Sequence, residues 1–257
     1  MMASLRFLDV RFNLIDHHSV FDQIIRWRDD EVTHMVVISN PHSVFLCRNC
    51  ELMRQAHRDS DMTLPDGVGI ILAANILGYE HAGRVTGASL VLKLCDWGRT
   101  RGLRHLVYGG APGVADSLVD SLTKRFPGLD VVGTHCPPYR EIGELEDDSV
   151  INMINETEPD IVWVGLGAPK QEVWMLKHQN RIKATAMIGV GAAFDFHSCR
   201  VKWAPAWVRS IGIEWLWRTI QEPKRMWRRN LNNSLFLALI LGQRARAIGK
   251  KSIGAKY

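Results

Sequence analysis

One carboxylate stands where a strand pattern ends and a helix pattern begins. Asp66 lies between Pro65 and Gly67, directly after the short apolar stretch 62–64 and before the helical pattern 70–77. An aspartate in such a place can cap the helix, because its oxygens accept hydrogen bonds from the first N–H groups. It can equally act as a general base if the strand end faces a substrate. The residues alone leave both interpretations open.

Glycine-containing loops follow three apolar strand patterns, at 109–114, 165–171 and 189–195. Glycine lets backbone N–H groups approach a ligand closely, and a helix N-terminus favours an anion such as a diphosphate. Glycine loops also form tight turns that bind nothing. None of the three matches G-x-G-x-x-G or the P-loop, which disfavours a standard dinucleotide enzyme or an NTPase. The glycines that we expect beside a substrate are Gly109, Gly110, Gly113, Gly167 and Gly191.

Three arginines near the C-terminus have helical spacing. Arg218, Arg225 and Arg228 would share one helical face if Pro223 kinked the axis only slightly. Guanidinium groups aligned in this way can clamp a diphosphate. The alternative is that they are solvated residues of an amphipathic helix.

No residue pattern indicates a metal or a cofactor. The segment 59–61 is formally D-x-D, but it falls at a helix exit before a strand, where we interpret it as a capping and turn segment. The five cysteines include Cys47 and Cys50 in a C-x-x-C without a partner pair, so we expect reduced thiols. We therefore predict no metal and no cofactor.

Alternating strand and helix patterns must position these residues. The 257-residue chain is long enough for a large core. Right-handed crossovers between successive strands predict an α/β fold with a Rossmann-like, mostly parallel sheet and helices on both faces. The strand ends then meet at one edge, where open parallel sheets bind ligands. The predicted strands are 11–15, 34–39, 62–64, 105–108, 130–133, 160–164 and 184–188, and the main predicted helices are 20–28, 41–58, 70–77, 88–101, 144–157 and 171–180.

The charge divides the chain in two. Residues 200–257 hold 13 Lys and Arg against 2 acids, and five of the nine tryptophans, whereas residues 1–199 are mildly acidic. We therefore predict an α/β core at 1–199 and a basic helical appendage at 200–257, with helices at 206–221 and 223–241. Its partner would be an anionic surface: a membrane leaflet, a nucleic acid or a substrate that carries phosphates. We expect the apolar run 235–241 to lie in a lipid headgroup layer.

No signal peptide and no apolar stretch of roughly 20 residues is found, so we expect a cytosolic protein.

Several motifs, taken together and in order, resemble the WecG/TagA/CpsF glycosyltransferases. The resemblance runs from about residue 10 to about residue 230, through Leu64-Pro65-Asp66-Gly67, Arg84-Val85-Thr86-Gly87, 109–115, Gly133-Thr134-His135, 159–172, 189–196 and 214–218. It implies an inverting, metal-independent transfer of a sugar, commonly N-acetylmannosamine or its uronic acid, from a UDP donor to a sugar on polyprenyl diphosphate. It also implies peripheral binding at the anionic inner face of the cell membrane, with no nucleic acid as partner. Homo-oligomerisation is left open.

The resemblance also assigns roles to residues. Asp66 matches the proposed general base, and Asn40 a binding asparagine. Arg218, Arg225 and Arg228 match tail arginines thought to close over the diphosphate. Arg84, Gln171 and Asp195 fall at further positions where we expect substrate binding.

Three departures from the family pattern leave the donor sugar open. They are Ile38 in place of Thr, Ser89 in place of an acid, and Cys136-Pro137-Pro138 in place of the residues usual after Gly-Thr-His. Glucose or a uronic acid in exopolysaccharide assembly therefore stays possible as the sugar transferred. Two other functions are weighed: a membrane- or nucleic-acid-binding module with a non-catalytic α/β scaffold, and a nucleotide-dependent oxidoreductase, which the missing dinucleotide fingerprint disfavours.

Overall fold

The computed structural model describes residues 4–79 and 83–254. The side chains of Arg225, Arg228, Arg229 and residues 245–254 lie outside that description.

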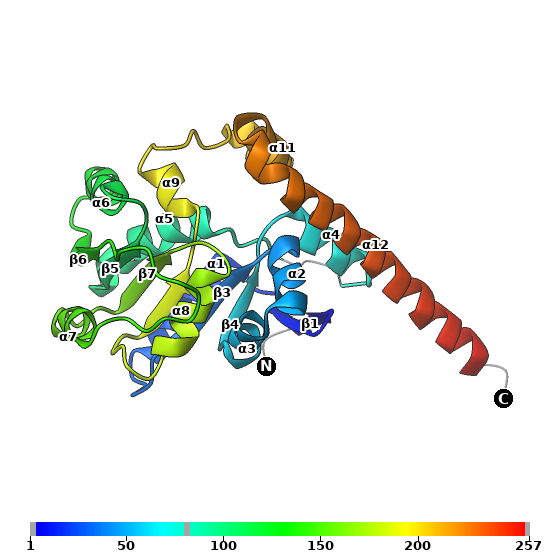
Figure 1. The fold of residues 1–257 in the computed structure, drawn as a ribbon, viewed down its shortest axis with the longest axis horizontal. Helices are drawn as coiled ribbons and strands as arrows, with labels where there is room; N and C mark the ends of the chain where they lie inside the picture. Colours follow the sequence, from blue (N-terminus) through cyan, green and yellow to red (C-terminus); the bar gives the residue numbers. More distant parts are fainter. Residues whose placement is uncertain (1–3, 80–82, 255–257) are drawn as a thin grey trace.

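Six parallel strands form one sheet in the order β4-β3-β8-β7-β5-β6 (Figure 1). This confirms the predicted Rossmann-like α/β fold. The expected strand 11–15 lies outside this sheet, as β2 (Val10–Asn13), which pairs antiparallel with β1 (Ser4–Phe7). In register, Ser39 pairs with Pro65 and Gly109 with Gly165, so the strands end together at one edge of the sheet. The strands are β3 (His34–Ser39), β4 (Met62–Pro65), β5 (Arg104–Gly109), β6 (Asp130–His135), β7 (Ile161–Gly165) and β8 (Ala186–Gly189).

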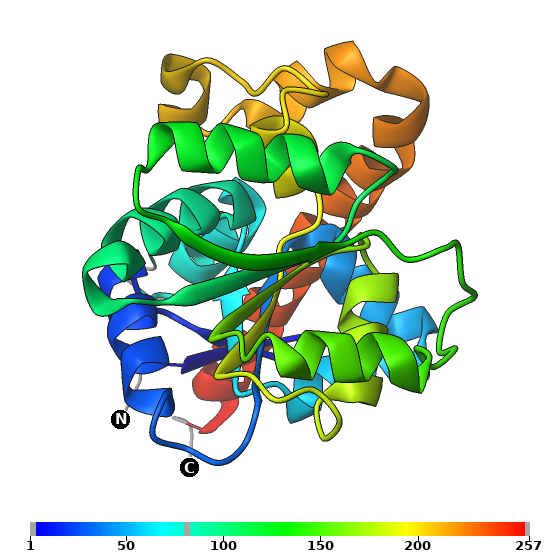
Figure 2. The ribbon, with the colours of Figure 1, turned by 90° about the vertical axis from the view of Figure 1, so that its left-hand side faces the viewer.

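Helices cover both faces of the sheet, as Figure 2 shows. Side chains alternate along each strand between two cores: in β7, Ile161 and Trp163 enter one, and Val162 and Val164 the other. The first core is closed by α1 (His17–Trp27), α5 (Gly87–Gly98, followed by the 3₁₀ turn Arg99–Arg101), α6 (Val114–Arg125) and α9 (Ala193–His197). The second is closed by α3 (Glu51–Asp59), α7 (Asp148–Glu156) and α8 (Lys170–His178).

Three of the predicted helices differ from the observed ones. The expected helix 206–221 is divided into α10 (Ala206–Ser210) and α11 (Glu214–Gln221). The expected helix 41–58 is split at Cys50, whose backbone is extended (φ −135°, ψ 111°), into α2 (Pro41–Asn49) and α3. The helix expected from 144 begins only at Asp148. The carboxyl of Glu146 is buried and accepts hydrogen bonds from Tyr108 and Arg140, which holds residues 136–147 as a loop.

The C-terminal segment is helical but is not a detached appendage. It comprises α10 (Ala206–Ser210), α11 (Glu214–Gln221) and α12 (Pro223–Gly254). Figure 1 shows α12 as a long helix that runs past α4 and α2. Helix α12 packs on α2 and on α4 (Val68–Ile76). None of the helices described in residues 4–79 and 83–254 is long and apolar enough to cross a membrane.

The apolar run 235–241 has one face buried in the protein, so the expectation that the whole run lies in a headgroup layer is corrected. Phe236 and Ile240 are fully buried, in a third core with Leu5, Phe7 and Phe12 of the antiparallel pair β1 (Ser4–Phe7) and β2 (Val10–Asn13). A spacing of four residues puts both on one helical face. Leu235, Leu239 and Leu241 are exposed on the rest of the helix.

Candidate functional site

A cleft of about 740 Å³ opens at the carboxyl edge of the sheet. The loops that follow β5, β6, β7 and β8 form its walls. Three of the five predicted glycines, Gly110, Gly167 and Gly191, line it, together with Asp195 of α9. The structure thus brings together substrate-binding candidates that lie far apart in the sequence.

The other two predicted glycines shape the loop after β5 and do not line the cleft. Gly109 has a φ of +110°, and a Cβ there would lie 3.0 Å from the carbonyl carbon of Gly165. Gly113 has a φ of +78° at the entry to α6. Between them, Gly110 donates its N–H to the carbonyl of Gly165 (3.1 Å). Glycine is required here because the two loops touch backbone to backbone.

Gln171 lies directly behind the cleft. It is 4% exposed, and its Oε1 accepts the N–H of Gly167 (3.2 Å). Its Nε2 donates to the carboxyl of Glu172 (2.9 Å). In this structure Gln171 therefore supports a loop of the cleft, and the expectation that it binds substrate stays a prediction.

Asp195 and Arg200 face each other on the cleft wall. Both line the cavity, and an Arg200 guanidinium nitrogen lies 3.8 Å from a carboxyl oxygen of Asp195. A half-exposed cation here can meet an anionic ligand, because the pair is loose and reaches water.

Three residues in and beside the loop after β6 were given no role by the sequence reasoning. Tyr139, Arg140 and Lys170 all line the cleft. The Lys170 ammonium lies 3.4 Å from the ring centroid of Tyr139 and donates to the carbonyl of Arg140 (2.9 Å). Burial and the Glu146 carboxyl raise the pKa of the Tyr108 hydroxyl beneath them. Two signals in the sequence could have found this group: Lys170 belongs to the quoted motif 159–172, and Tyr139 directly follows the altered segment Cys136-Pro137-Pro138.

Asn40 and Asp66 lie at the same edge but outside the cleft lining. Asn40 begins α2, and its Oδ1 accepts the N–H of Ser43 (3.2 Å). Asp66 follows β4, is half-buried, and donates its backbone N–H to Ser39 (2.9 Å). Gly67 occupies the N-cap position of α4, so the capping place falls to glycine and not to Asp66.

The segment 84–87 joins the two parts of the edge. Val85 donates to the carbonyl of Pro65 (3.0 Å), and a Cβ on Gly87 would lie 2.9 Å from the carbonyl oxygen of Val190. Arg84 is tied to the tail, with Nη2 at 2.9 Å from the carboxyl of Glu214. Its predicted role in substrate binding is not tested by this contact.

The tail meets the cleft where α11 ends. The Arg218 guanidinium carbon lies 5.2 Å from the ring centroid of Phe196, and its Nε is 3.6 Å from the carboxyl of Glu222, which lines the cleft. Glu222 (φ −130°, ψ 61°) separates α11 from α12, so Arg218 lies on a different helix from Arg225 and Arg228, and the slight kink on which a shared helical face depended is not found. Arg225 and Arg228 belong to α12, but their side chains lie outside the described residues.

Only one of the three sequence departures touches the cleft. Ile38 is a core residue, and Ser89 lies in the first turn of α5, where its hydroxyl meets His17 (2.7 Å) and its N–H donates to Thr86 (3.1 Å). Cys136 and the two prolines after it line the cavity, with the Cys136 thiol at 3.4 Å from the carbonyl of Gly110. Of the three departures from the family pattern, the one in the loop after β6 is therefore the one that a ligand bound in the cleft could contact.

The D-x-D segment is structural. Ser60 ends α3, and Asp61 accepts the N–H of Met35 (2.8 Å) and lies 3.2 Å from His34. Its oxygens serve the turn between α3 and β4, as the capping interpretation predicts.

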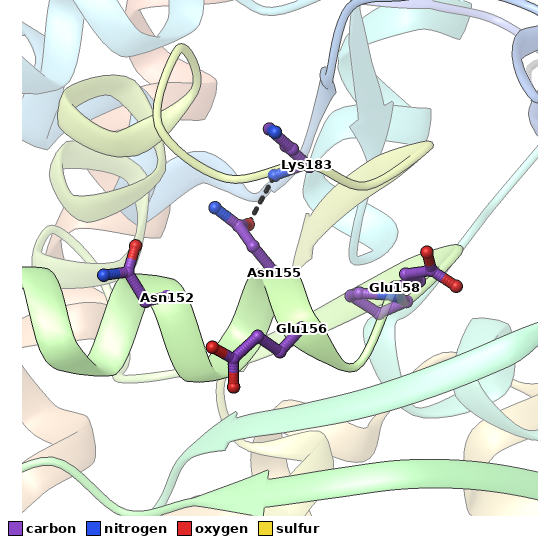
Figure 3. Close-up of a pocket in the computed structure, with 6 residues that line it drawn as sticks. Asn152, Asn155, Glu156, Glu158 and Lys183 are labelled. Atoms are coloured by element: carbon purple, nitrogen blue, oxygen red, sulfur yellow. Dashed lines mark hydrogen bonds between the residues drawn. The ribbon is translucent and has the colours of Figure 1, made fainter.

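A second, shallower pocket of about 580 Å³ lies on the side of the molecule away from the glycine loops (Figure 3). Asn155 bridges it, accepting the N–H of Lys183 (2.8 Å) and donating to the carbonyl of Arg181 (2.9 Å). These bonds fasten α7 to the loop before β8, so the pocket is structural.

Known proteins resemble this chain over most of its length. The family described as Glycosyl transferase WecG/TagA/CpsF family matches residues 5–250. A Bacillus spizizenii protein named N-acetylglucosaminyldiphosphoundecaprenol N-acetyl-beta-D-mannosaminyltransferase is 28% identical over 206 residues, 80% of this chain and 78% of the relative. A Staphylococcus aureus (strain MW2) protein of the same name is 27% identical over 193 residues, 75% of this chain and 74% of the relative. An enzyme is thus favoured over a non-catalytic scaffold, and the chain belongs to the WecG/TagA/CpsF family of glycosyl transferases.

Proposed function

We propose that this protein transfers N-acetylmannosamine, or a related hexose or uronic acid, from a UDP-sugar to a sugar carried on polyprenyl diphosphate, with inversion at the anomeric carbon. The observation that carries the proposal is the carboxyl edge itself, where the glycine-walled cleft and Asp66 lie at the ends of strands of one sheet. The names of the two curated relatives supply the acceptor class and the preferred sugar.

Asp66 is assigned the role of general base. Its carboxylate takes the proton from the acceptor hydroxyl, the hydroxyl oxygen bonds to the anomeric carbon, and the bond from that carbon to the UDP oxygen breaks. A half-buried carboxylate that directly follows β4 suits this role, because it lies at the edge of the sheet where the cleft opens and is still accessible from solvent.

We assign the leaving diphosphate to the cleft and to the end of α11, where Arg218 lies beside the cleft. Arg200 and Arg218, beside the loops that carry Gly110, Gly167 and Gly191, would stabilise the charge that develops on UDP. Guanidinium groups bind phosphate in a planar fork. Arg225 and Arg228 complete this clamp in the proposal.

The tail is assigned to an anionic membrane surface, where the acceptor resides. Basic residues in this segment add attraction to anionic lipid. Large apolar side chains are exposed on α10, α11, the start of α12 and also on α4, which begins two residues after Asp66. The members of this apolar surface are Val68, Leu72, Trp207, Ile211, Trp215, Leu216, Ile220, Trp227 and Leu231.

A panel of UDP-sugars, each incubated with a short-chain lipid-diphosphate N-acetylglucosamine, tests the proposal by product formation. We expect one UDP-sugar to be used, with an inverted product, and UDP to raise the melting temperature where NADH does not. Stabilisation by NADH without UDP stabilisation, or no transfer from any UDP-sugar, would contradict it.

A further inference from the structure

A fully buried carboxyl group lies behind the cleft. Glu172, in the first turn of α8, is 0% exposed. Its Oε1 accepts a hydrogen bond from the side chain of Gln171 (2.9 Å). Its Oε2 is buried and has no hydrogen-bond partner among the described residues.

This arrangement is costly to the fold. A buried carboxylate with one unpaired oxygen loses the favourable free energy of its hydration. The positive N-terminal end of α8 offsets only part of this loss. Burial accordingly raises the pKa of Glu172 to about 7. An apolar side chain of similar size would suit the same place better, as replacements of buried charges often show. Stability is therefore not the reason for a carboxyl here.

What the carboxylate does is fix the amide of Gln171. In this structure Oε1 of Glu172 accepts a hydrogen bond from Nε2 of Gln171, and Oε1 of Gln171 accepts the N–H of Gly167 (3.2 Å). Above its pKa the carboxylate only accepts hydrogen bonds, so it holds the amide in this orientation. If the amide were flipped, the oxygen of Gln171 would face the oxygen of Glu172, and the NH₂ group of Gln171 would face the N–H of Gly167, so neither hydrogen bond could form.

The oriented amide then sets the spacing of two cleft loops. A Cβ on Gly189 would lie 3.0 Å from Nε2 of Gln171, and one on Gly191 would lie 3.3 Å from its Oε1, so the amide packs directly under the turn after β8. Gln171 also donates its backbone N–H to the carbonyl of Gly167 (3.0 Å). Gly167 and Gly191 both line the cleft.

We propose that Glu172 is a positioning residue for donor binding. It holds the Gln171 amide in one orientation and thereby keeps the loops after β7 and β8 at the separation that the sugar nucleotide requires. This inference rests on the proposed function, since it needs the cleft to be the donor site.

Two substitutions at the same position separate this role from a structural one. Glu172→Met keeps the size and removes the acceptor. It should keep or raise the unfolding midpoint, while it weakens UDP binding and lowers kcat/KM for the donor about tenfold or more, as for a lost hydrogen bond to a charged group. Glu172→Gln keeps an acceptor oxygen and should stay within about threefold of the wild type.

A third variant tests the route through Gln171. If Glu172 acts only by orienting that amide, Glu172→Met added to Gln171→Met should lower kcat/KM no further than Gln171→Met alone.

Three results would overturn the inference: a Glu172→Met protein that fails to fold, one whose activity falls only in step with its melting temperature, or one with unchanged UDP affinity. Calorimetry with UDP on the wild-type protein keeps the two proposals apart. Absence of UDP binding there refutes the proposed function, whereas wild-type binding with an unaffected Glu172→Met variant refutes this inference alone.

Discussion

The two halves of the carboxyl edge are made from different parts of the chain. At the ends of β5 to β8, the cleft is held by contacts mostly within the α/β body, such as the Gly110–Gly165 and Gln171–Gly167 bonds. At the ends of β3 and β4, α12 packs on α2 and α4, the helices that follow Asn40 and Asp66. The half that we assign to the donor is thus built by the body, whereas the half that we assign to the acceptor needs the C-terminal helices.

This difference suggests a division of labour. A rigid cleft preorganises the loops that bind a nucleotide, because its glycines and buried side chains have few alternative arrangements. In the proposed function, an acceptor carried by a membrane would instead be bound by the helices that expose tryptophan and lysine or arginine. Variants in one half should then change donor affinity, and variants in the other should change turnover or membrane binding.

The largest effect is expected at Asp66. Asp66→Asn removes the proposed base and should lower kcat by about 10²- to 10⁴-fold, while UDP affinity measured by calorimetry stays near that of the wild type. Asp59→Asn, an exposed carboxylate of the D-x-D segment, is the matched control and should retain activity. A fully active Asp66→Asn protein would exclude the base assignment.

The second effect tests how firmly α12 is docked. Phe236→Ala opens a cavity in the third core and should cost about 3–5 kcal/mol of unfolding free energy in a denaturant titration. Its neighbour Leu235 is 46% exposed, and Leu235→Ala should change stability by less than about 0.5 kcal/mol. Equal losses for the two variants would mean that α12 does not pack on the body as described.

A third, smaller effect concerns the exposed apolar surface. Trp207→Ala and Trp215→Ala should each lower partitioning onto anionic vesicles about tenfold, because each removes buried apolar area in the headgroup layer. Val32, equally exposed but on the body, provides the control, and Val32→Ala should sediment with vesicles as the wild type does. Loss of binding to anionic and neutral vesicles alike would argue against the electrostatic part of the proposal.

The smallest effect is a pH dependence within the body. Burial lowers the pKa of His57 and His105 to about 4 from an ordinary value of 6.5. The unfolded chain then binds more protons between these values, so stability is full above pH 6.5 and falls as the pH drops towards 4. Glu172 acts in the opposite sense, because its raised pKa lets the folded state bind the extra proton between about 7 and 4.5.

The histidines should outweigh the one glutamate, because burial also lowers the pKa of His17, His178 and His197, so the net loss should be at least on the order of 1 kcal/mol from pH 7 to pH 5. Thermal melts at both pH values measure it. In Glu172→Met the loss should be larger, since the opposing contribution is gone. A melting temperature that rises on acidification would contradict the neutral, buried state of these histidines.

Periodicity and turn residues sufficed to predict the parallel sheet and the edge that carries the site. An apolar run such as 161–164 followed by glycine has few alternatives to a buried strand, and parallel strands must end together. The extension of the loop after β6 to residue 147 could not be predicted from the sequence, because Glu146 is held out of the following helix by its hydrogen bond with Tyr108 of β5. The run 235–241 was misjudged for a similar reason, since hydropathy does not say whether a lipid or a protein core covers Phe236.

The amino-acid sequence by itself determined the fold class, the family and the positions of Asp66 and the glycine loops, since these depend on local pattern and residue type. Tertiary structure alone decided that Gly109 and Gly113 shape a loop without lining the cleft, that Arg218 is separated from Arg225 and Arg228 by a break, and that Glu172 stands behind the donor loops. The physical reason is that contacts between distant segments depend on how helices and loops pack, and no local pattern encodes that.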